Sequence, residues 1–420
     1  MTLIDRLRTH ARRREAAAFL RYLGPGLLVT VGFIDPGNWA SDIAAGASYG
    51  YVLLWVITLG TVLLIILQHN AAHLGIATGL CLSEATTKYI RPVPARLILS
   101  SAVLASVSTA LAEVLGGAIG LRMLFPGLPL QAGAVLVMAF AMVMLGTNTY
   151  PKIEKLIVAF VALIGLAFLY EVLLVHVPWR TVAVAWVRPS LPAGSIFIVM
   201  SLLGAVVMPH NLFLHSEVIQ SREWNLKDEK VIQRQLKYEF NDTLFSMGVG
   251  WAINSAMVIV AAATFFGKMR ITELEQAHDM LGPLVGPTAA VVFALALLLA
   301  GLASSVTAGM AGSTIFAAMF GETYDIKDLH SKLGAAVTLI VATAGIFLVT
   351  DPFKALLLSQ MLLSIQLPIT IVTQIRLTSS REVMGKYANT PLLRVLLWAV
   401  AAVVIGLNVM LVRALILARA

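Results

Sequence analysis

The sequence is poor in charge and nearly free of cysteine. Only 12% of its 420 residues are charged, 59% are hydrophobic, and the mean hydropathy is +0.88. A soluble protein of this size needs a larger charged surface, so the composition excludes that class and indicates an integral membrane protein. The single cysteine, Cys81, excludes an internal disulfide, and we do not expect it to bind metal.

Long polar segments and enzymatic motifs are also missing. The longest polar connections, 219–239, 266–285 and 377–391, are too short to bury a core. We interpret 219–239 as a surface helix or loop, and we prefer a solvated linker. Cys–His pairs, a nucleophile elbow and a phosphate-binding glycine loop are absent, so we expect neither an enzyme nor a cofactor. The glycines of GGAIG, residues 116–120, are interpreted as residues that let helices pack closely.

The chain contains a series of apolar runs, each long enough to cross a bilayer as a helix of about 17 residues or more. This pattern predicts an all-α integral membrane protein and excludes a barrel of alternating strands. We predict eleven spans, at 24–47, 51–76, 98–121, 129–147, 153–176, 193–218, 240–265, 286–316, 334–350, 354–375 and 392–416.

Basic residues predict the orientation of these spans. Most of the 30 lysines and arginines lie in the N-terminal tail, residues 1–23, and in alternate connections. The positive-inside rule then places the N-terminus in the cytoplasm and the C-terminus outside a plasma or inner membrane. No cleavable signal is recognisable in the tail. We expect the bilayer as a partner, no nucleic acid, and no obligate protein partner.

Two predicted spans are interrupted by matching polar elements that contain proline. Asp35-Pro36-Gly37-Asn38 lies within 24–47, and Met208-Pro209-His210-Asn211 lies within 193–218. Proline lacks an N–H and its ring crowds the carbonyl four residues earlier, so both helices should be broken. The elements lie five spans apart, which predicts two inverted repeats, 24–176 and 193–375, followed by the last span.

The polar groups at these breaks suit a divalent metal ion. Asp35 is an ionisable group inside a span, which needs a cation, a proton or a partner, and Asn38 adds an amide oxygen. Pro209 frees the carbonyl of Ala205, and Met208 adds a thioether. The local alternatives are helix capping by Asp35 and core packing by Met208. Together, this mixed set favours Mn²⁺ or Fe²⁺ over Mg²⁺ or Ca²⁺.

Four stretches resemble the Nramp family of divalent metal transporters: residues 24–50 with IDPGN, 111–120 (LAEVLGGAIG), 208–216 (MPHNLFLHS) and 359–368 (SQMLLSIQLP). The resemblance covers nearly the whole chain. It implies the leucine-transporter fold, with the first and sixth helices discontinuous, and proton-coupled import of ions such as Mn²⁺, Fe²⁺ and Cd²⁺ into the cytoplasm. It also implies metal ligands at Asp35, Asn38, the Ala205 carbonyl and Met208, with Gln360 joining in some conformations.

The resemblance implies a proton route through Glu113 of the third span and His210 beside the sixth-span break. For both residues the local alternative is a hydrogen-bonded structural role. His215 lies nearer the end of its span, and we interpret it as a structural or gating residue. The sequence departs from the family pattern at Ala110, where many members have aspartate. It also departs from the pattern in its eighth and ninth predicted spans, 286–316 and 334–350. We therefore expect an intact metal site with weak or altered proton coupling.

Three other functions are weighed against this one. A related magnesium transporter would be expected to lack Met208. An organic-solute symporter on the same fold would need a pocket for a carboxylate or an amine. A carboxylate that faces a thioether does not suit such a substrate. A membrane sensor would need a signalling extension, whereas this sequence ends at Ala420, shortly after its last predicted span.

Overall fold

A computed structural model describes residues 35–147, 165, 168, 170–222, 228–268, 271–276 and 287–417. Within these ranges the regular structure is entirely helical. The helices are α3 (Pro36–Tyr49), α4 (Leu54–Thr78), α5 (Leu82–Tyr89), α6 (Pro92–Leu124), α7 (Leu130–Gly146), α9 (Trp179–Val187), α10 (Ile196–Val206), α11 (Pro209–Val218), η1 (Ile219–Arg222), α12 (Glu229–Phe265), α14 (Pro287–Ala318), α15 (Leu329–Ile346), α16 (Pro352–Thr378), α17 (Arg381–Met384), η2 (Gly385–Tyr387) and α18 (Pro391–Leu417).

Most predicted spans correspond to helices of the structure. In the described residues, 8 helices are long and apolar enough to cross a membrane, with α10 and α11 taken as one span, and α7 is a shorter apolar helix. α3 forms the second half of the predicted first span. The predicted tail 1–23, residues 24–34 and most of the fifth span, 153–176, lie outside the described residues.

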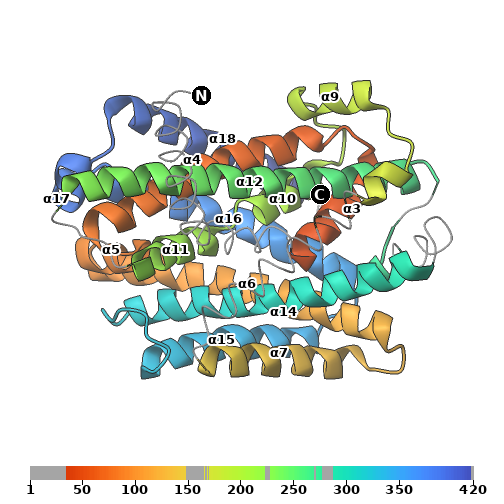
Figure 1. Cartoon of the computed structure of the whole chain (residues 1–420), viewed down its shortest axis with the longest axis horizontal. Coiled ribbons are helices and arrows are strands. Elements are labelled where there is room, and N and C mark those ends of the chain that lie inside the picture. Colours follow the sequence, from red (N-terminus) through yellow and green to blue (C-terminus); the bar gives the residue numbers. More distant parts are fainter. Residues whose placement is uncertain are drawn as a thin grey trace, which may run out of the picture.

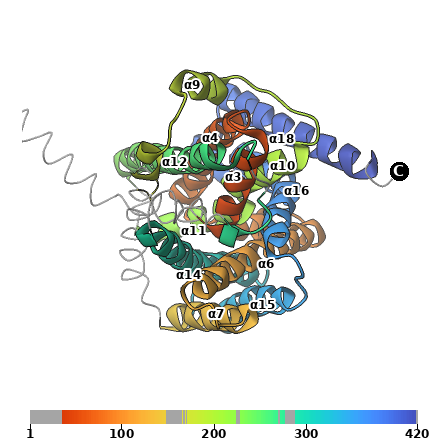
Figure 2. The same cartoon turned by 90° about the vertical axis from the view of Figure 1, so that its right-hand side faces the viewer.

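The helices form two groups that share α16. Figure 2 shows α6, α7, α14 and α15 together on one side, and α3, α4, α10 and α12 together on the other. Figure 1 shows α16 running between these groups, where it packs against both α6 and α10. The broken helices therefore face the central α16.

Burial distinguishes the central helices from the peripheral ones. In the apolar 18-residue stretch of Ile196–Val218, which contains α10 and α11, 83% of the residues are buried, whereas in that of Pro391–Leu417, which is α18, only 33% are buried. The apolar surface that α18 leaves uncovered is suited to lipid contact, since lipid tails solvate apolar side chains. The helix break in the sixth span is thus a feature of the protein interior.

Glycines allow α6 and α14 to approach closely. A Cβ atom added to Gly301 would lie 2.5 Å from the backbone nitrogen of Gly117, and one added to Gly120 would lie 2.7 Å from the nitrogen of Leu298. Neither distance leaves room for a side chain. The prediction that the GGAIG glycines serve close helix packing agrees with these contacts.

The interpretation of 219–239 as a solvated linker is wrong for its second half. α12 begins at Glu229, after Asp228 caps it by accepting a hydrogen bond from the Lys230 N–H at 2.9 Å. The helix continues into the bilayer span and packs against α4. Glu239 is only 2% exposed, because its charge is satisfied by side chains of neighbouring helices rather than by water.

Candidate metal centre

The first proline element places a buried carboxylate at the N-terminus of α3. Asp35 is the N-cap residue, and its Oδ1 accepts a hydrogen bond from the backbone N–H of Asn38 at 2.6 Å. Pro36 follows at the first helical position, where its missing N–H costs nothing. The other oxygen, Oδ2, is buried and has no hydrogen-bond partner among the described residues. The capping role and an available ligand oxygen therefore coexist in Asp35.

The second break separates α10 from α11 as the sequence predicts. α10 ends at Val206, α11 begins at Pro209, and the intervening Met208 has an extended backbone with φ −81° and ψ 120°. Its side chain is fully buried beside Ala105 and Leu363. The Met208 sulfur accepts a hydrogen bond from Asn211 Nδ2 at 3.4 Å, which orients the thioether.

Direct contacts join the two breaks. Asn38 Nδ2 donates to the carbonyl oxygen of Ala205 at 3.1 Å, so the first turn of α3 is tied to the last turn of α10. One turn further along α3, the hydroxyl groups of Ser41 and Ser201 are 2.7 Å apart. The structure thus brings the Asp35–Asn38 element against Ala205, which lies three residues before Met208.

Gln360 of α16 lies against the same region. It is fully buried, and neither atom of its side-chain amide has a hydrogen-bond partner within the described ranges. A Cβ atom on Gly37 would come within 1.8 Å of Gln360 Nε2, so the amide sits directly on the first turn of α3. An unpaired buried amide is costly unless something occupies it, which fits a group that meets a transported ion.

Glu113 lies on α6 close to Asp35. Its Oε1 accepts a hydrogen bond from Thr109 at 3.2 Å, and its carboxyl group is near enough to that of Asp35 for electrostatic interaction. Ala110, on the preceding turn, is fully buried. The second carboxylate that the family pattern would place there is replaced by a methyl group.

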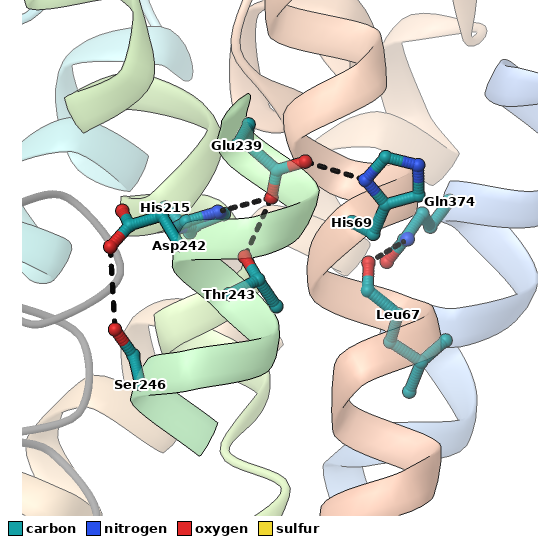
Figure 3. A network of polar contacts seen from close by, with 8 residues as sticks. All are labelled: Leu67, His69, His215, Glu239, Asp242, Thr243, Ser246 and Gln374. Carbon is teal, nitrogen blue, oxygen red and sulfur yellow. Dashed lines mark hydrogen bonds and ion pairs between the residues drawn. The ribbon is translucent and has the colours of Figure 1, made fainter. Parts of the chain in front are cut away.

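The two histidines of α11 have different surroundings. His210 follows Pro209 directly and is 3% exposed, and its Nδ1 has no partner in the described part of the chain. The Nε2 atom of His215 lies 3.3 Å from Glu239 Oε1, and the opposite oxygen of Glu239 lies 2.5 Å from His69 Nδ1 (Figure 3). Thr243 donates a further hydrogen bond to Glu239 at 2.7 Å.

Sequence reasoning missed this His215–Glu239–His69 chain. Glu239 was assigned to a solvated linker, and His69 stands in an apolar helix, α4, without a local motif around it. The side chain of Glu239 is 1% exposed and that of His69 is 31% exposed, so the chain runs from a buried histidine to a partly accessible one. An ionisable residue within a predicted span was the only available signal for His69.

Asp42 is a further buried carboxylate on α3. It lies seven residues after Asp35, which is about two helical turns along the same face. It is fully buried, neither of its oxygens has a hydrogen-bond partner among the described residues, and it is near enough to Asp35 for electrostatic repulsion. The structure therefore adds Asp42 to the acidic groups around the breaks.

Chemically, this arrangement can bind a divalent cation that has lost much of its water. Asp35 and Met208 are the N-cap residues of α3 and α11, and the Asn38–Ala205 hydrogen bond joins these two elements. Irregular backbone at membrane depth is tolerated where it lines a binding site. Broken, facing helices inside a membrane bundle are the arrangement of a secondary transporter, not of an enzyme.

Comparison with solved structures identifies the fold. The chain matches Mhp1, a nucleobase-cation-symport-1 family transporter in a closed conformation, with a TM-score of 0.65 and 17% identity over 94% of this chain and 90% of that one. It matches MhsT in complex with L-phenylalanine with a TM-score of 0.58 and 13% identity over 92% and 98% of the two chains. The fold is thus the all-helical leucine-transporter fold.

Comparison of sequences identifies the family. The family model described as natural resistance-associated macrophage protein-like, Nramp, matches residues 26–414. A divalent metal cation transporter MntH from Nostoc sp. is 36% identical over 93% of this chain and 90% of its own length. The MntH protein of Caldanaerobacter subterraneus is 37% identical over 94% and 93%.

A solved structure agrees with this assignment. The Eremococcus coleocola manganese transporter, in complex with an aromatic bis-isothiourea substituted compound, superposes with a TM-score of 0.80 and 27% identity over 93% of this chain and 86% of that one. The chain belongs to the Nramp family. It is a multi-pass membrane transporter and not an enzyme.

Proposed function

We propose that this chain imports divalent transition-metal ions, Mn²⁺ together with Fe²⁺ and Cd²⁺, through a site formed by Asp35, Asn38, the Ala205 carbonyl and Met208. The observation that carries the proposal is the 3.1 Å hydrogen bond from Asn38 to Ala205, which holds the two helix breaks against each other. The names of the relatives, divalent metal cation transporter and manganese transporter, support it. Gln360 is the further ligand that α16 brings to the site.

The donor set supports transition metals over the more abundant hard cations. Carboxylate and carbonyl oxygens bind Mg²⁺, Ca²⁺ and Mn²⁺ alike, and they do not discriminate by themselves. The Met208 thioether is soft, and its full burial beside the break leaves it within the dehydrated site. Mg²⁺ gains little from sulfur and loses its water reluctantly, so the thioether selects against it.

Metal uptake into proteoliposomes tests the proposal. The wild-type chain is expected to take up Mn²⁺ in competition with Fe²⁺ and Cd²⁺, and to exclude Ca²⁺ and Mg²⁺. Met208→Ala should relax the discrimination against Ca²⁺ about tenfold, which corresponds to about 1.4 kcal/mol. Met247→Ala is the matched control, since Met247 is also buried but lies on α12.

Two outcomes would contradict the proposal. Unchanged selectivity in Met208→Ala would show that the thioether is not a ligand. Saturable Mg²⁺ uptake that Mn²⁺ does not inhibit would favour the related magnesium transporters instead.

We also propose that proton coupling is weak or follows a different route from that of the family. Ala110 supports this, because it removes a carboxylate from α6 and leaves Glu113 beside Asp35. A different route has a candidate in the His215–Glu239–His69 chain, in which consecutive titratable groups are 3.3 Å and 2.5 Å apart. Protons can pass along such a chain of hydrogen-bonded acids and bases.

Recording internal pH during Mn²⁺ uptake distinguishes these possibilities. Weak coupling predicts metal entry without matching acidification. The alternative route predicts acidification that Glu239→Gln abolishes while Mn²⁺ binding is retained. Acidification in proportion to metal entry that persists in Glu239→Gln would refute both forms of the proposal.

We propose the following organisation in the membrane: a cytoplasmic tail, 1–23, inverted repeats at 24–176 and 193–375, and a last span, 392–416, that ends outside the plasma membrane. The matching helix breaks of α3 and α11 support the repeats, since both helices begin directly at the proline of their element. Labelling of single cysteines introduced near each end, in a Cys81→Ser background, tests the orientation. The N-terminal cysteine should react with an impermeant reagent only after the cells are opened.

A further inference from the structure

A second group of metal-ligating side chains lies where α5 meets the end of α11. The backbone N–H of Leu82 donates to the Ser216 hydroxyl at 2.9 Å, which attaches the start of α5 to α11. Figure 1 shows the two helices side by side on the same side of the molecule. This contact brings Cys81, Glu84 and Glu217 together, and one ligand atom from each lies within 4.8 Å of the other two.

The contacts of these three residues leave ligand atoms available. Glu84 Oε2 accepts a hydrogen bond from the Cys81 backbone N–H at 2.8 Å, which caps α5 and leaves the other oxygen of Glu84 for a ligand. The Cys81 sulfur lies 3.0 Å from the Ser83 hydroxyl and is 1% exposed. The Oε2 atom of Glu217 is buried and has no hydrogen-bond partner among the described residues.

Helix capping explains Glu84 but does not explain Glu217. A carboxylate oxygen buried without a partner, beside a second carboxylate, is destabilising unless a cation or a proton compensates it. A sulfur atom with two carboxylates is a set of donors that binds Fe²⁺, Co²⁺, Zn²⁺ and Cd²⁺, with water completing the shell. A metal-binding role for Cys81 would depart from the expectation drawn from the sequence.

The Cys81 thiol restricts which metal ions can bind at this site. The Cys81 sulfur is a soft donor, whereas the two carboxylates are hard donors that bind many divalent ions. A metal ion must displace the thiol proton in order to bind this sulfur. Ions with high affinity for thiolate can do so, whereas Mg²⁺ and Ca²⁺ cannot.

We propose that Cys81, Glu84 and Glu217 form a binding site for a thiophilic divalent transition-metal ion, separate from the site at the helix breaks. Glu217 follows Met208 by nine residues on the same helical segment, which is about 13 Å along the axis. If import proceeds as proposed above, this position lies on the exit side of the transport site. Metal binding here does not depend on that assignment.

Binding of Co²⁺ to the purified full-length chain tests the site. All samples carry Asp35→Asn and Met208→Ala, so that neither the carboxylate nor the sulfur of the transport site contributes. We expect one Co²⁺ ion per chain, with a thiolate-to-cobalt charge-transfer absorption band that Cys81→Ser abolishes. Glu217→Gln should weaken Co²⁺ binding by about tenfold or more, as loss of a metal-site carboxylate does.

Controls separate binding from folding and from general charge. Serine is itself a good N-cap residue, and glutamine keeps the size of glutamate, so both variants should keep their thermal unfolding midpoint. Glu382→Gln, at an exposed position of α17, should bind Co²⁺ unchanged. Cd²⁺ should displace Co²⁺, whereas excess Mg²⁺ should not.

The proposal is overturned if the background protein shows no thiolate band, if Glu217→Gln binds Co²⁺ as tightly as its parent, or if Mg²⁺ competes as well as Cd²⁺. Since the carboxylate and the sulfur of the transport site are already removed in every sample, none of these results depends on whether the chain imports metal. Failure of Mn²⁺ uptake by the wild-type chain would in turn leave the Co²⁺ result unaffected.

Discussion

Replacing Gly37 by alanine tests how Gln360 is placed at the transport site. A Cβ atom at this position would lie 1.8 Å from Gln360 Nε2 and 2.5 Å from its Cδ, far inside van der Waals contact. Both atoms belong to the end of a flexible side chain. We therefore expect the amide to rotate away from α3 while the two helices keep their positions.

Two opposing effects of Gly37→Ala should keep the change in the free energy of unfolding small. Overpacking a filled site costs about 1–3 kcal/mol, but rotation of the amide relieves much of this strain. Alanine in place of glycine within a helix stabilises by up to about 1 kcal/mol. The free energy of unfolding should thus change by only about 1 kcal/mol. Mn²⁺ affinity should fall about tenfold, or about 1.4 kcal/mol, if Gln360 is a ligand.

Titration calorimetry with Mn²⁺ on four proteins provides the measurement: wild type, Gly37→Ala, Gln360→Ala and the double variant. Each single change should weaken binding by about tenfold, and the double variant should bind no more weakly than either, because both changes remove the same ligand. Gly248→Ala is the matched control, since a Cβ on this helical glycine meets no atom within 4 Å. Mn²⁺ affinity equal to that of wild type in Gly37→Ala would refute the reasoning. So would a loss of affinity in the double variant equal to the product of the two single losses.

Two further predictions concern the packing of the helices and the buried network. Gly301→Ala should destabilise the protein by about 1–3 kcal/mol, because the three atoms nearest to the added Cβ all belong to the backbone, including the Glu113 carbonyl oxygen at 2.8 Å. Thermal unfolding in detergent, with Gly406→Ala as control, measures this change. Glu239→Ala should cost about 1–3 kcal/mol, because it leaves the buried His215 ring and the Thr243 hydroxyl without their hydrogen-bond acceptor. A Glu239→Ala unfolding midpoint equal to that of wild type would show that the network is not stabilising.

Local patterns accounted for most of the described spans and for the helix starts at the two proline elements. The length of an apolar run determines whether a helix can cross the bilayer, and proline acts on its own helix, so both effects act within a few residues. For this reason α3 and α11 begin at Pro36 and Pro209 as predicted. The same local reasoning was wrong for Glu239, because a run of charges looks alike whether water or a neighbouring helix satisfies it.

The sequence by itself determined the class of protein, the positions of the two breaks and the kinds of ligand available at each, because these follow from hydropathy, proline geometry and side-chain chemistry. Only the tertiary structure decided which groups meet. The contact between Asn38 and Ala205 spans 167 residues of sequence and depends on how α3 packs against α10. The position of Gln360 against Gly37, and the meeting of Cys81 with Glu217, depend in the same way on helix packing, which no local pattern encodes.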